Sequence, residues 1–448
     1  MQPASATRPS QTWSYEDALA WLYARQALGI KLGLAKVERL LAALGDPHRA
    51  YRSIHIGGTN GKGSVARLLS ETLRRAGYKT GLTTSPHLVS FVERIEVDGK
   101  PIAKAEVAAG LAKVRQAVAP LDAAGDAPTF FECVTALAFL HFRDAGVQWA
   151  VVEVGMGGRL DATNVLTPEL TIITNVDLDH TAHLGPTVAD IAWEKAGIMK
   201  PGVPLVTGAS GQALFVLKAR SHDLRVAMSV LGEDYQLVPE QDELIILRPN
   251  GEAHYTVGLA GQHQKRNAAL AVAACGALRW KGTPVPEHAV REALAQTRHP
   301  GRLETFDVGA GQLADHPVEV LLDGAHNIAA AHALRFHLGQ SGFTDFHLVA
   351  GFCADKDWAE AVDQWAPLAE RVWCVPVRNP RTLDPDSLAA HVAASGIPTQ
   401  VAPDAAAALR MAAQAGAKRI LVAGSLFLAG EARAALTGQP LEEIRGSQ

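Results

Sequence analysis

The sequence has few cysteines and no long apolar run. Its four cysteines, Cys133, Cys275, Cys353 and Cys374, form no C-x-x-C pair, so neither a zinc site nor a disulfide framework is indicated. The segment from Met1 to Trp13 lacks the basic start and apolar core of a signal peptide, and no apolar stretch approaches the roughly 18 residues that span a bilayer. We therefore expect a cytoplasmic protein with no membrane partner.

The sequence also lacks an excess of charge of one sign. Lysine and arginine number 42 against 46 aspartates and glutamates, a formal net charge of −4, which is too near neutrality for a general nucleic-acid binder. We expect no nucleic-acid partner, and any bound anion must meet a local site. With 448 residues, 48% of them hydrophobic and 20% charged, the chain has the composition of a folded protein of two or three domains.

The first part of the chain alternates between predicted strands and helices. Apolar residues at helical spacing predict two helices between Tyr15 and Leu44, with Gly29 and Gly33 in the loop that joins them. A strand at 53–56, a glycine-rich loop, a helix at 65–76 and a strand at 80–84 form a βαβ unit, whose two strands we expect to pair in parallel. Further buried strands are predicted at 149–154, 170–174 and 204–207, and a helix at 132–143. This pattern predicts a doubly wound, mostly parallel α/β sheet.

The second part begins a new alternation. A small antiparallel element is predicted at 236–257, followed by helices at 267–278 and 287–297, and the segment His299 to Arg302 marks a domain boundary. Beyond it, strands are predicted at 318–322, 346–350, 372–376 and 419–422, and helices at 329–338, 359–368, 387–394 and 405–415. We expect a P-loop domain over residues 1–297 and a smaller, Rossmann-like α/β domain over 298–448.

A glycine-rich loop between a predicted strand and a predicted helix is the strongest local signal. Residues 57–64 read GGTNGKGS; such a loop brings backbone N–H groups and a helix N-terminus to phosphate oxygens, while its lysine neutralises their charge. The loop departs from the common G-x-x-x-x-G-K-[ST] spacing, because Gly63 separates Lys62 from Ser64. The alternative is a tight strand-to-helix turn with a surface lysine.

Polar residues follow the next predicted strands. Ser85 comes directly after the strand at 80–84, and Glu153 lies near the end of an apolar strand, both at the carboxyl edge where open α/β sheets bind ligands. A buried carboxylate is costly unless it is paired or binds a metal. A Mg²⁺ ligand beside the phosphate loop is the simplest account of Glu153, and a buried salt bridge is the alternative.

Two more segments carry candidate chemistry. The glycine-led loop 157–164 is suited to close approach by a substrate, although an ordinary polar loop would look the same. His180 follows a strand beside Asp177 and Asp179 and could complete a metal site, whereas a lone histidine is more often structural. Lys195 lies in an apolar helical turn, where burial would lower its pKa; sequence alone would place it on the surface.

Taken together, these segments resemble the folylpolyglutamate synthase/dihydrofolate synthase family of Mur-ligase-like enzymes. The resemblance runs in order along nearly the whole chain, in ten motifs: GTNGKGS (58–64), SPHL (85–88), FFE (130–132), EVGMGGRLDATN (153–164), DHT (179–181), EKAGI (194–198), HQKRNAA (263–269), HPGRLE (299–304), DGAHN (323–327) and DKD (355–357). Any one of them could arise by chance, whereas ten in series are very specific.

The resemblance implies a set of site residues. Those for ATP are Gly58, Thr59, Asn60, Gly61, Lys62, Gly63, Ser64, Asn267, Arg302, Asp323 and His326. Those for Mg²⁺, with two ions expected, are Ser85, Glu153 and His180. Those for the pterin substrate are Phe131, Glu132, Leu160, Asp161 and Ala162. Lys62, His180 and Lys195 would take part in catalysis, and Lys195 matches the family's carbamylated lysine.

The implied reaction is the ATP-dependent addition of L-glutamate to tetrahydrofolate, and also to dihydropteroate, through an acyl phosphate. Acyl phosphates hydrolyse, so we expect the active site to lie between two closing domains of a monomer. Bifunctional relatives commonly have an acidic residue at an early loop position that corresponds here to Lys31. Lys31 could instead face the glutamate tail of a folate.

Two other functions are compatible with parts of this pattern. A Mur-type ligase of peptidoglycan precursors would use the same phosphate loop and lysine, but FFE and GGRLDATN resemble folate enzymes, and we expect no separate uridine-nucleotide domain before residue 57. The second alternative is a P-loop ATPase or binding module that needs no amino-acid substrate.

Overall fold

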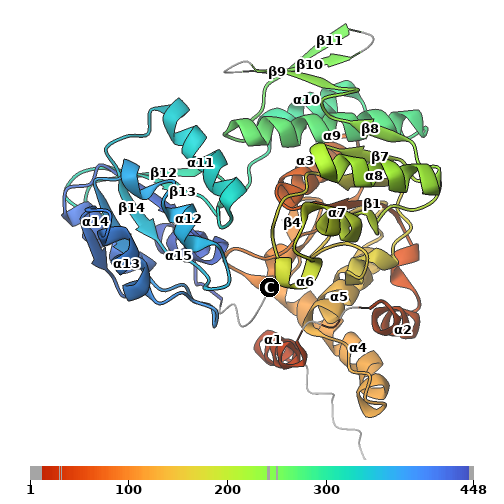
Figure 1. Cartoon of the computed structure of the whole chain (residues 1–448). Helices are drawn as coiled ribbons and strands as arrows, with labels where there is room; N and C mark the ends of the chain where they lie inside the picture. The colour runs from red at the N-terminus through yellow and green to blue at the C-terminus, as the bar shows by residue number, and fades with distance from the viewer. Residues whose placement is uncertain (1–12, 30, 32, 240–242, 249–250, 443–448) are drawn as a thin grey trace, which may run out of the picture.

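The computed structural model describes residues 13–29, 31, 33–239, 243–248 and 251–442, which form two α/β units and a small third sheet (Figure 1). The first unit holds an eight-stranded sheet and the second a six-stranded sheet. Within the described residues, no helix is long and apolar enough to cross a membrane.

The eight-stranded sheet has the order β4-β3-β2-β5-β1-β6-β7-β8. Six strands are parallel, and β3 and β4 add an antiparallel edge. The strands are β1 (Arg52–Gly57), β2 (Thr80–Thr83), β3 (Ile95–Val97), β4 (Lys100–Pro101), β5 (Trp149–Glu153), β6 (Leu170–Ile173), β7 (Leu205–Thr207) and β8 (Met228–Val230). The doubly wound, mostly parallel sheet is confirmed.

One expected pairing is wrong. β1 and β2 are parallel but not neighbours, because β5 lies between them and pairs with both. All five residues of β5 are buried. A strand without a polar face is most stable at the centre of a sheet, where helices cover both sides.

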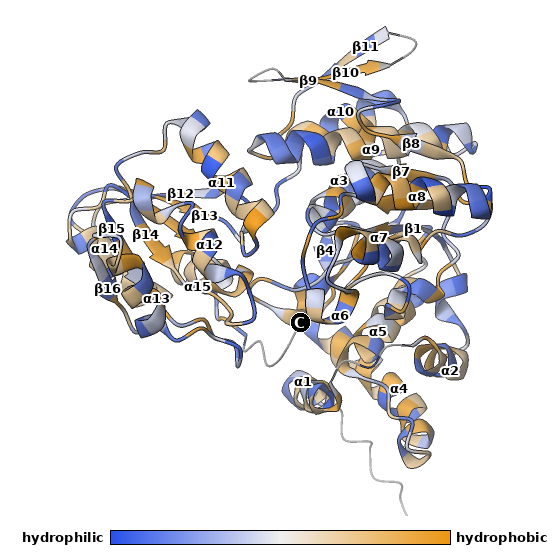
Figure 2. Ribbon diagram, in the orientation of Figure 1, coloured by the Kyte–Doolittle hydropathy of each residue, from blue (hydrophilic) through white to orange (hydrophobic). Residues whose placement is uncertain are grey.

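Helices cover both faces of this sheet. On one face, α3 (Lys62–Arg75), α9 (Gln262–Trp280) and α10 (Glu287–Gln296) share a core with Ile54 and Ile56 of β1. On the other, α1 (Tyr15–Ala24), α2 (Ala35–Ala43), α4 (Lys104–Ala123) and α5 (Phe130–Asp144) pack on Ala150 and Val152. Helices α7 (Val188–Ala196) and α8 (Gly211–Leu224) share a core with Leu205 of β7, and the short helix α6 (Thr181–Leu184) precedes α7. Figure 2 shows apolar residues concentrated on the strands and the inner helix faces.

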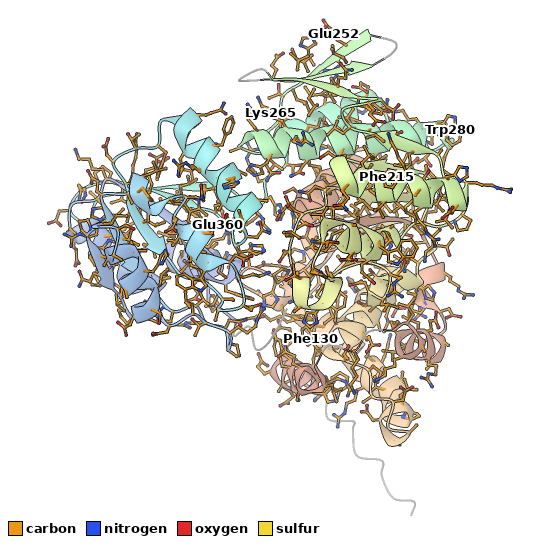
Figure 3. The ribbon with its side chains drawn as sticks, viewed as in Figure 1. Phe130, Phe215, Glu252, Lys265, Trp280 and Glu360 are labelled. Atoms are coloured by element: carbon orange, nitrogen blue, oxygen red, sulfur yellow. The ribbon has the colours of Figure 1, made fainter. Side chains whose placement is uncertain are left out.

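The predicted antiparallel element is a three-stranded sheet that lies over the first unit. It consists of β9 (Gln236–Pro239), β10 (Leu244–Arg248) and β11 (Gly251–Tyr255), with β10 in the centre. Leu244, Ile246 and Tyr255 pack into the same core as α3 and α9. The sheet therefore buries one face and leaves its tip, marked by Glu252 in Figure 3, exposed.

The second unit has the strand order β12-β13-β17-β14-β15-β16, parallel except for β12. The strands are β12 (Glu304–Val308), β13 (Val318–Leu322), β14 (His347–Ala350), β15 (Arg371–Cys374), β16 (Thr399–Val401) and β17 (Arg419–Ala423). The helices are α11 (Ile328–Ser341), α12 (Trp358–Val362), α13 (Pro385–Ala393), α14 (Ala405–Gln414) and α15 (Leu426–Thr437). The helix expected at 359–368 is wrong: α12 ends at Val362 and a short 3-10 turn, Ala366–Leu368, follows. Pro367 lacks the N–H that a continuing helix needs.

The two units touch through the segment after Ser85 and through the last described residues. Leu88 and Val89 form an apolar cluster with Ala429 and Ala434 of α15. The Glu442 carboxylate accepts hydrogen bonds from the Tyr15 hydroxyl (2.8 Å) and the Phe91 amide (2.9 Å). The end of the described chain thus returns to the first unit, and the division at residues 297 and 298 stays a prediction.

Candidate active site

The glycine-rich loop joins β1 to the N-terminus of α3 in the centre of the first sheet. Gly58 and Gly61 have φ of +140° and +83°, backbone conformations that side chains disfavour. A Cβ at Gly58 would lie 1.9 Å from the Thr174 Oγ1, and one at Gly61 would lie 2.4 Å from the Asn267 Oδ1. The loop is therefore enclosed between the end of β6 and helix α9, and only glycine fits at these two positions.

Residues that follow β6 hold this loop in shape. The Asn60 amide donates to the Asn175 Oδ1 (2.8 Å), and the Thr174 hydroxyl donates to the Asn60 carbonyl (2.6 Å). The Thr59 hydroxyl donates to the Asp177 carbonyl (3.1 Å) and accepts from the Asp177 amide (3.0 Å). These contacts hold the loop between β1 and α3 in one conformation.

Two lysines converge on the same loop carbonyl. The Lys62 ammonium, on the first residue of α3, donates to the carbonyls of Gly58 and Thr59, both at 3.1 Å. Lys195, near the end of α7, donates to the Gly58 carbonyl at 3.0 Å. Burial, with the charge of Lys62, lowers the pKa of Lys195 to about 7. Lys195 is only 3% exposed, so the expected burial is confirmed and the alternative of a surface lysine is wrong.

The carboxylate of Glu153 lies beside the start of α3. It stands at the end of β5, is 6% exposed and accepts a hydrogen bond from the Ser85 amide (3.1 Å). A Cβ at Gly63 would be 3.5 Å from its Oε2. Burial raises the pKa of Glu153, while Lys62, the Ser85 amide and Arg302 oppose that rise. Within the described residues no salt bridge to this carboxylate is found, and the positive charges that act on it are those of Lys62, Arg302 and Arg94.

His180 is the residue before the short helix α6 and has a left-handed backbone conformation, with φ of 51°. Its Nε2 lies 3.8 Å from the Asp179 Oδ1. Burial lowers the pKa of His180 to about 4, although Asp179 opposes the shift. The ring is therefore neutral at neutral pH and keeps a nitrogen lone pair, which metal binding requires.

The second unit contributes residues to the same region. The Lys356 ammonium donates to the Asp179 Oδ1 at 2.7 Å, and the Asn327 side chain donates to the Asn60 Oδ1 at 3.0 Å. Although burial opposes it, the nearby His180 and Lys356 hold the pKa of Asp179 well below its usual range. The carboxyl edges of the two sheets therefore meet around the phosphate loop.

The four expected ATP contacts outside the loop lie at this junction. Asn267 of α9 is 8% exposed and packs on Gly61. The Asp323 carboxylate accepts from the amides of Leu303 and Ala325, both at 2.9 Å. Burial raises the pKa of both Asp323 and Glu153. The positive charge of the Arg302 guanidinium opposes the rise at both carboxylates, so Arg302 lies near a residue of each unit. His326 donates from Nδ1 to the Gly324 carbonyl (2.8 Å), and burial lowers its pKa to about 4.

The expected substrate residues divide into two sets. Phe131 lines a pocket that also includes Ser85 and Glu153. Leu160 is half-buried in the loop before Asp161. Glu132 instead caps α5, since its Oε2 accepts from the Thr129 amide at 2.6 Å, and Ala162 is part of the core under α5. Figure 3 marks the start of α5 with Phe130.

Asp161 is buried at the foot of the polar loop 157–164. One of its oxygens accepts from the Met156 amide (2.9 Å) and the other from the Thr163 amide (3.0 Å). Lys31, which lies between α1 and α2, is exposed. It is not among the residues that line the pocket.

Three residues at this junction were missed from the sequence. Arg94 is 1% exposed and lines the same pocket. The ring of His299 lies 3.2 Å from the Ser64 hydroxyl, measured from Nδ1 to Oγ. Lys356 belongs to the DKD motif, but its contact with Asp179 crosses 177 residues. His299 and Lys356 lie in the motifs HPGRLE and DKD, which were the available signal, whereas Arg94 lies in a stretch with no such signal.

Comparisons with known proteins cover both units. Residues 56–275 match the Mur ligase middle domain, and residues 301–426 match the Mur ligase glutamate ligase domain. A dihydrofolate synthase/folylpolyglutamate synthase of Mycobacterium tuberculosis is 36% identical over 445 residues, which cover 89% of each chain. A probable bifunctional folylpolyglutamate synthase/dihydropteroate synthase of Haloferax volcanii is 36% identical over 94% of this chain. The matched part covers 50% of the length of that archaeal relative, so the chain spans about half of it.

Solved structures agree with the whole fold. The Mycobacterium tuberculosis folylpolyglutamate synthase complexed with ADP superposes with a TM-score of 0.84 at 32% identity, covering 94% of this chain and 99% of the other. The Escherichia coli FolC in complex with DHPP and ADP gives a TM-score of 0.83 at 28% identity, covering 94% and 98%. Both of those proteins therefore bind ADP on the fold that this chain adopts.

Proposed function

Because the chain belongs to the folylpolyglutamate synthase/dihydrofolate synthase family of Mur ligases, and is an ATP-dependent ligase, we propose that it joins L-glutamate to tetrahydrofolate and to dihydropteroate. The observation that carries this proposal is the convergence of Lys62, Lys195 and Glu153 on one preorganised phosphate loop at the junction of the two units. The same junction contains the neutral His180 and the Lys356 ammonium.

The reaction requires activation of a poor electrophile. A carboxylate oxygen of the acceptor attacks the γ-phosphorus of ATP, the bond to the β-γ bridging oxygen breaks, and ADP leaves. The glutamate amine then attacks the acyl-phosphate carbonyl, inorganic phosphate departs, and the amine loses a proton. Lys62 and the backbone amides at the start of α3 stabilise the charge on the transferred phosphoryl group.

The residues of the site fit Mg²⁺. The donors assigned to it are the Ser85 hydroxyl, the Glu153 carboxylate and the neutral His180 ring, and Mg²⁺ favours a few protein oxygens completed by phosphate and water. Within the described residues, no group of three or more His, Cys, Asp or Glu side chains could hold a metal by itself. When bound, Mg²⁺ would neutralise charge on the phosphates.

Lys195 has the properties that carbamylation needs. An amine reacts with CO₂ only when unprotonated, and burial lowers the pKa of Lys195 to about 7, so much of it is neutral at physiological pH. The nitrogen bonds to the CO₂ carbon and loses a proton, and the product is a carbamate anion. That anion would sit near the Lys62 ammonium, where a second Mg²⁺ is proposed.

The second unit supplies the enclosure that an acyl phosphate needs. Asn327 and Lys356 contact Asn60 and Asp179 directly, so residues of the second unit lie against the loop. A substrate bound between the two units would be shielded from water there.

Release of ADP tests the proposed function. The purified protein with Mg-ATP is assayed with and without L-glutamate, and with tetrahydrofolate, dihydropteroate or no acceptor. We expect ADP only when acceptor and glutamate are both present, and loss of the signal in Lys62→Ala. ADP release without either substrate would favour a P-loop ATPase, and release only with a peptidoglycan precursor would favour a different Mur ligase. Failure with dihydropteroate alone would restrict the acceptor to folates.

A further inference from the structure

A buried chain of hydrogen bonds runs from the central strand β1 to Asp161. His55 is 0% exposed and lies in the middle of β1, opposite Val152 of β5 and Thr171 of β6. Ile54 and Ile56 pack on the α3 side, so the alternation of the strand directs His55 to the other face. There its Nε2 lies 2.7 Å from the Thr163 Oγ1.

The direction of each hydrogen bond follows from the donors available. Both Asp161 oxygens accept backbone N–H groups, so the carboxylate acts as an acceptor and the Thr163 hydroxyl donates to its Oδ1. Burial raises the pKa of Asp161, and these hydrogen bonds oppose that rise. The bond from Thr163 to Asp161 uses the single hydroxyl proton, so His55 must donate from Nε2 to the Thr163 oxygen. Burial lowers the pKa of His55 to about 3, so the ring is neutral and the proton lies on Nε2. The Nδ1 is buried without a hydrogen-bond partner in the described chain.

This arrangement has a cost that an apolar residue would avoid. An imidazole in the centre of a sheet, with one ring nitrogen unpartnered, is less favourable than valine or leucine at the same place. The series of hydrogen bonds ends at the carboxylate of Asp161, which is 7% exposed and already accepts two backbone N–H groups. Thr163 itself lines the pocket that contains Phe131, Ser85 and Glu153. The hydrogen bonds therefore connect the strand beneath the phosphate loop to the pocket.

We propose that His55 and Thr163 are positioning residues for the acceptor substrate, acting by fixing the orientation of the Asp161 carboxylate beside the pocket that Thr163 lines. This inference rests on the proposed function, in which Asp161 binds the acceptor. The imidazole N–H fixes the rotation of the Thr163 hydroxyl, and that hydroxyl fixes one carboxylate oxygen. The Asp161 carboxylate then has one orientation before the acceptor binds, so binding of the acceptor does not have to reorient it.

Matched substitutions at Thr163 separate the hydrogen bond from packing. Thr163→Val keeps the side-chain volume but removes the hydroxyl, whereas Thr163→Ser keeps the hydroxyl. A hydrogen bond to a charged group corresponds to about a tenfold change in affinity or more. We expect Thr163→Val to raise the KM for the acceptor by about tenfold, to leave the KM for ATP and for glutamate within about twofold, and Thr163→Ser to resemble the unsubstituted protein.

A second pair tests His55. In His55→Gln the amide nitrogen reaches the position of Nε2 and can donate to Thr163, whereas His55→Met cannot donate. The account predicts a raised acceptor KM for His55→Met and at least partial recovery for His55→Gln. Unfolding midpoints of all four variants are measured beside the kinetics. If the three KM values rise together with a lowered midpoint, the residues are merely structural and the proposal is overturned.

Asp161→Asn separates this inference from the proposed function. A raised acceptor KM in Asp161→Asn with no change in Thr163→Val and His55→Met would leave the function standing and overturn the positioning role. Unchanged acceptor KM in all three variants would remove Asp161 from the acceptor site, and the positioning role would fail with it. A raised acceptor KM in all three is the expected result.

Discussion

Burial shifts the ionisable side chains at the junction toward their neutral forms. The pKa of Lys195 is lowered to about 7 and that of His180 to about 4, while the pKa of Glu153 is raised. Removing a charge from water is costly, so each group that lacks a close partner moves toward its uncharged state. Lys62 and Arg302 then provide the positive charge that anionic phosphates and carboxylates meet.

Lys195→Met tests whether this lysine serves chemistry and not stability. We expect kcat to fall by about 100-fold or more. The unfolding midpoint at pH 7 should not fall, because a lysine whose pKa is lowered from 10.5 to about 7 in the folded protein destabilises the folded state at every pH below 10.5. Steady-state kinetics and thermal unfolding are measured together. Lys218→Met, at an exposed position of α8, is the control and should retain activity. Normal turnover in Lys195→Met would contradict its role.

Glu431 on α15 makes stability depend on pH. Burial raises its pKa from 4.5 to about 7, so the folded state binds a proton more tightly than the unfolded chain. The stabilising contribution of Glu431 is therefore fully present below pH 4.5 and is lost as pH rises toward 7. At pH 8 we expect Glu431→Gln to raise the free energy of unfolding by about 1 to 3 kcal/mol, and at pH 4 to change it little.

Denaturant unfolding at the two pH values measures this difference. Glu360→Gln, at an exposed position of α12, is the control and should change stability by less than about 0.5 kcal/mol at either pH. An equal effect of Glu431→Gln at pH 4 and pH 8 would show that packing and not ionisation is responsible.

At the scale of elements, helix α3 is flanked by two glycines, Gly61 before its start and Gly77 after its end, and we expect substitutions at the two positions to have different effects. Gly61→Ala places a Cβ 2.4 Å from the Asn267 Oδ1 in the left-handed region, whereas Gly77→Ala, after the other end of α3 at φ +90°, meets nothing within 4 Å. We expect Gly61→Ala to raise the KM for ATP by about tenfold or more. Gly77→Ala should cost only about 1 kcal/mol of stability. Nucleotide titration and unfolding distinguish them, and equal ATP binding by both would contradict the enclosure of the loop.

The central elements could be predicted from the sequence, and the edge elements could not. The segment 318–322 matches β13 in full, because its residues other than Glu319 are apolar and buried, as expected of a strand that is covered on both faces. β4 has two exposed residues, and Val308 is the one buried residue of β12, so neither segment contains an apolar run that stands out from a loop. The order of β1, β5 and β2 also escaped prediction, since the sequence contains no record of which parallel strand lies between two others.

The site shows the same limit at the level of contacts. The loop, Glu153 and His180 could be placed at a sheet edge because each follows a predicted strand. The hydrogen bond from Lys195 to Gly58 joins residues 137 positions apart, and without it Lys195 looked like a surface lysine. Glu132 belongs to a motif, yet its carboxylate caps α5, which local sequence also signals through Thr129.

At the scale of the whole molecule, the two units meet at the carboxyl edges of their sheets. The ion pair of Lys356 with Asp179 crosses this junction, with side chains 13% and 11% exposed. A partly buried pair of this kind is screened far less by salt than a surface pair. It is therefore suited to hold the second unit over the phosphate loop.

Lys356→Met tests this closure. Loss of the pair should let water reach the acyl phosphate, so we expect more ADP released per glutamate joined and a lower kcat. Parallel assays of ADP and of glutamylated product give the ratio. Lys113→Met removes an exposed pair with Asp144 and should leave the ratio at one. A ratio that stays at one in Lys356→Met would show that closure does not depend on this contact.

The central claim, ligation through an acyl phosphate, is tested most directly by the fate of an acceptor oxygen. The acceptor is prepared with heavy oxygen in the carboxylate that is to be joined, and it is incubated with Mg-ATP, L-glutamate and the protein. The account predicts one labelled oxygen in the released phosphate for each glutamate joined, because the acceptor oxygen becomes the oxygen between carbon and phosphorus. Glutamylated product accompanied by unlabelled phosphate would contradict it.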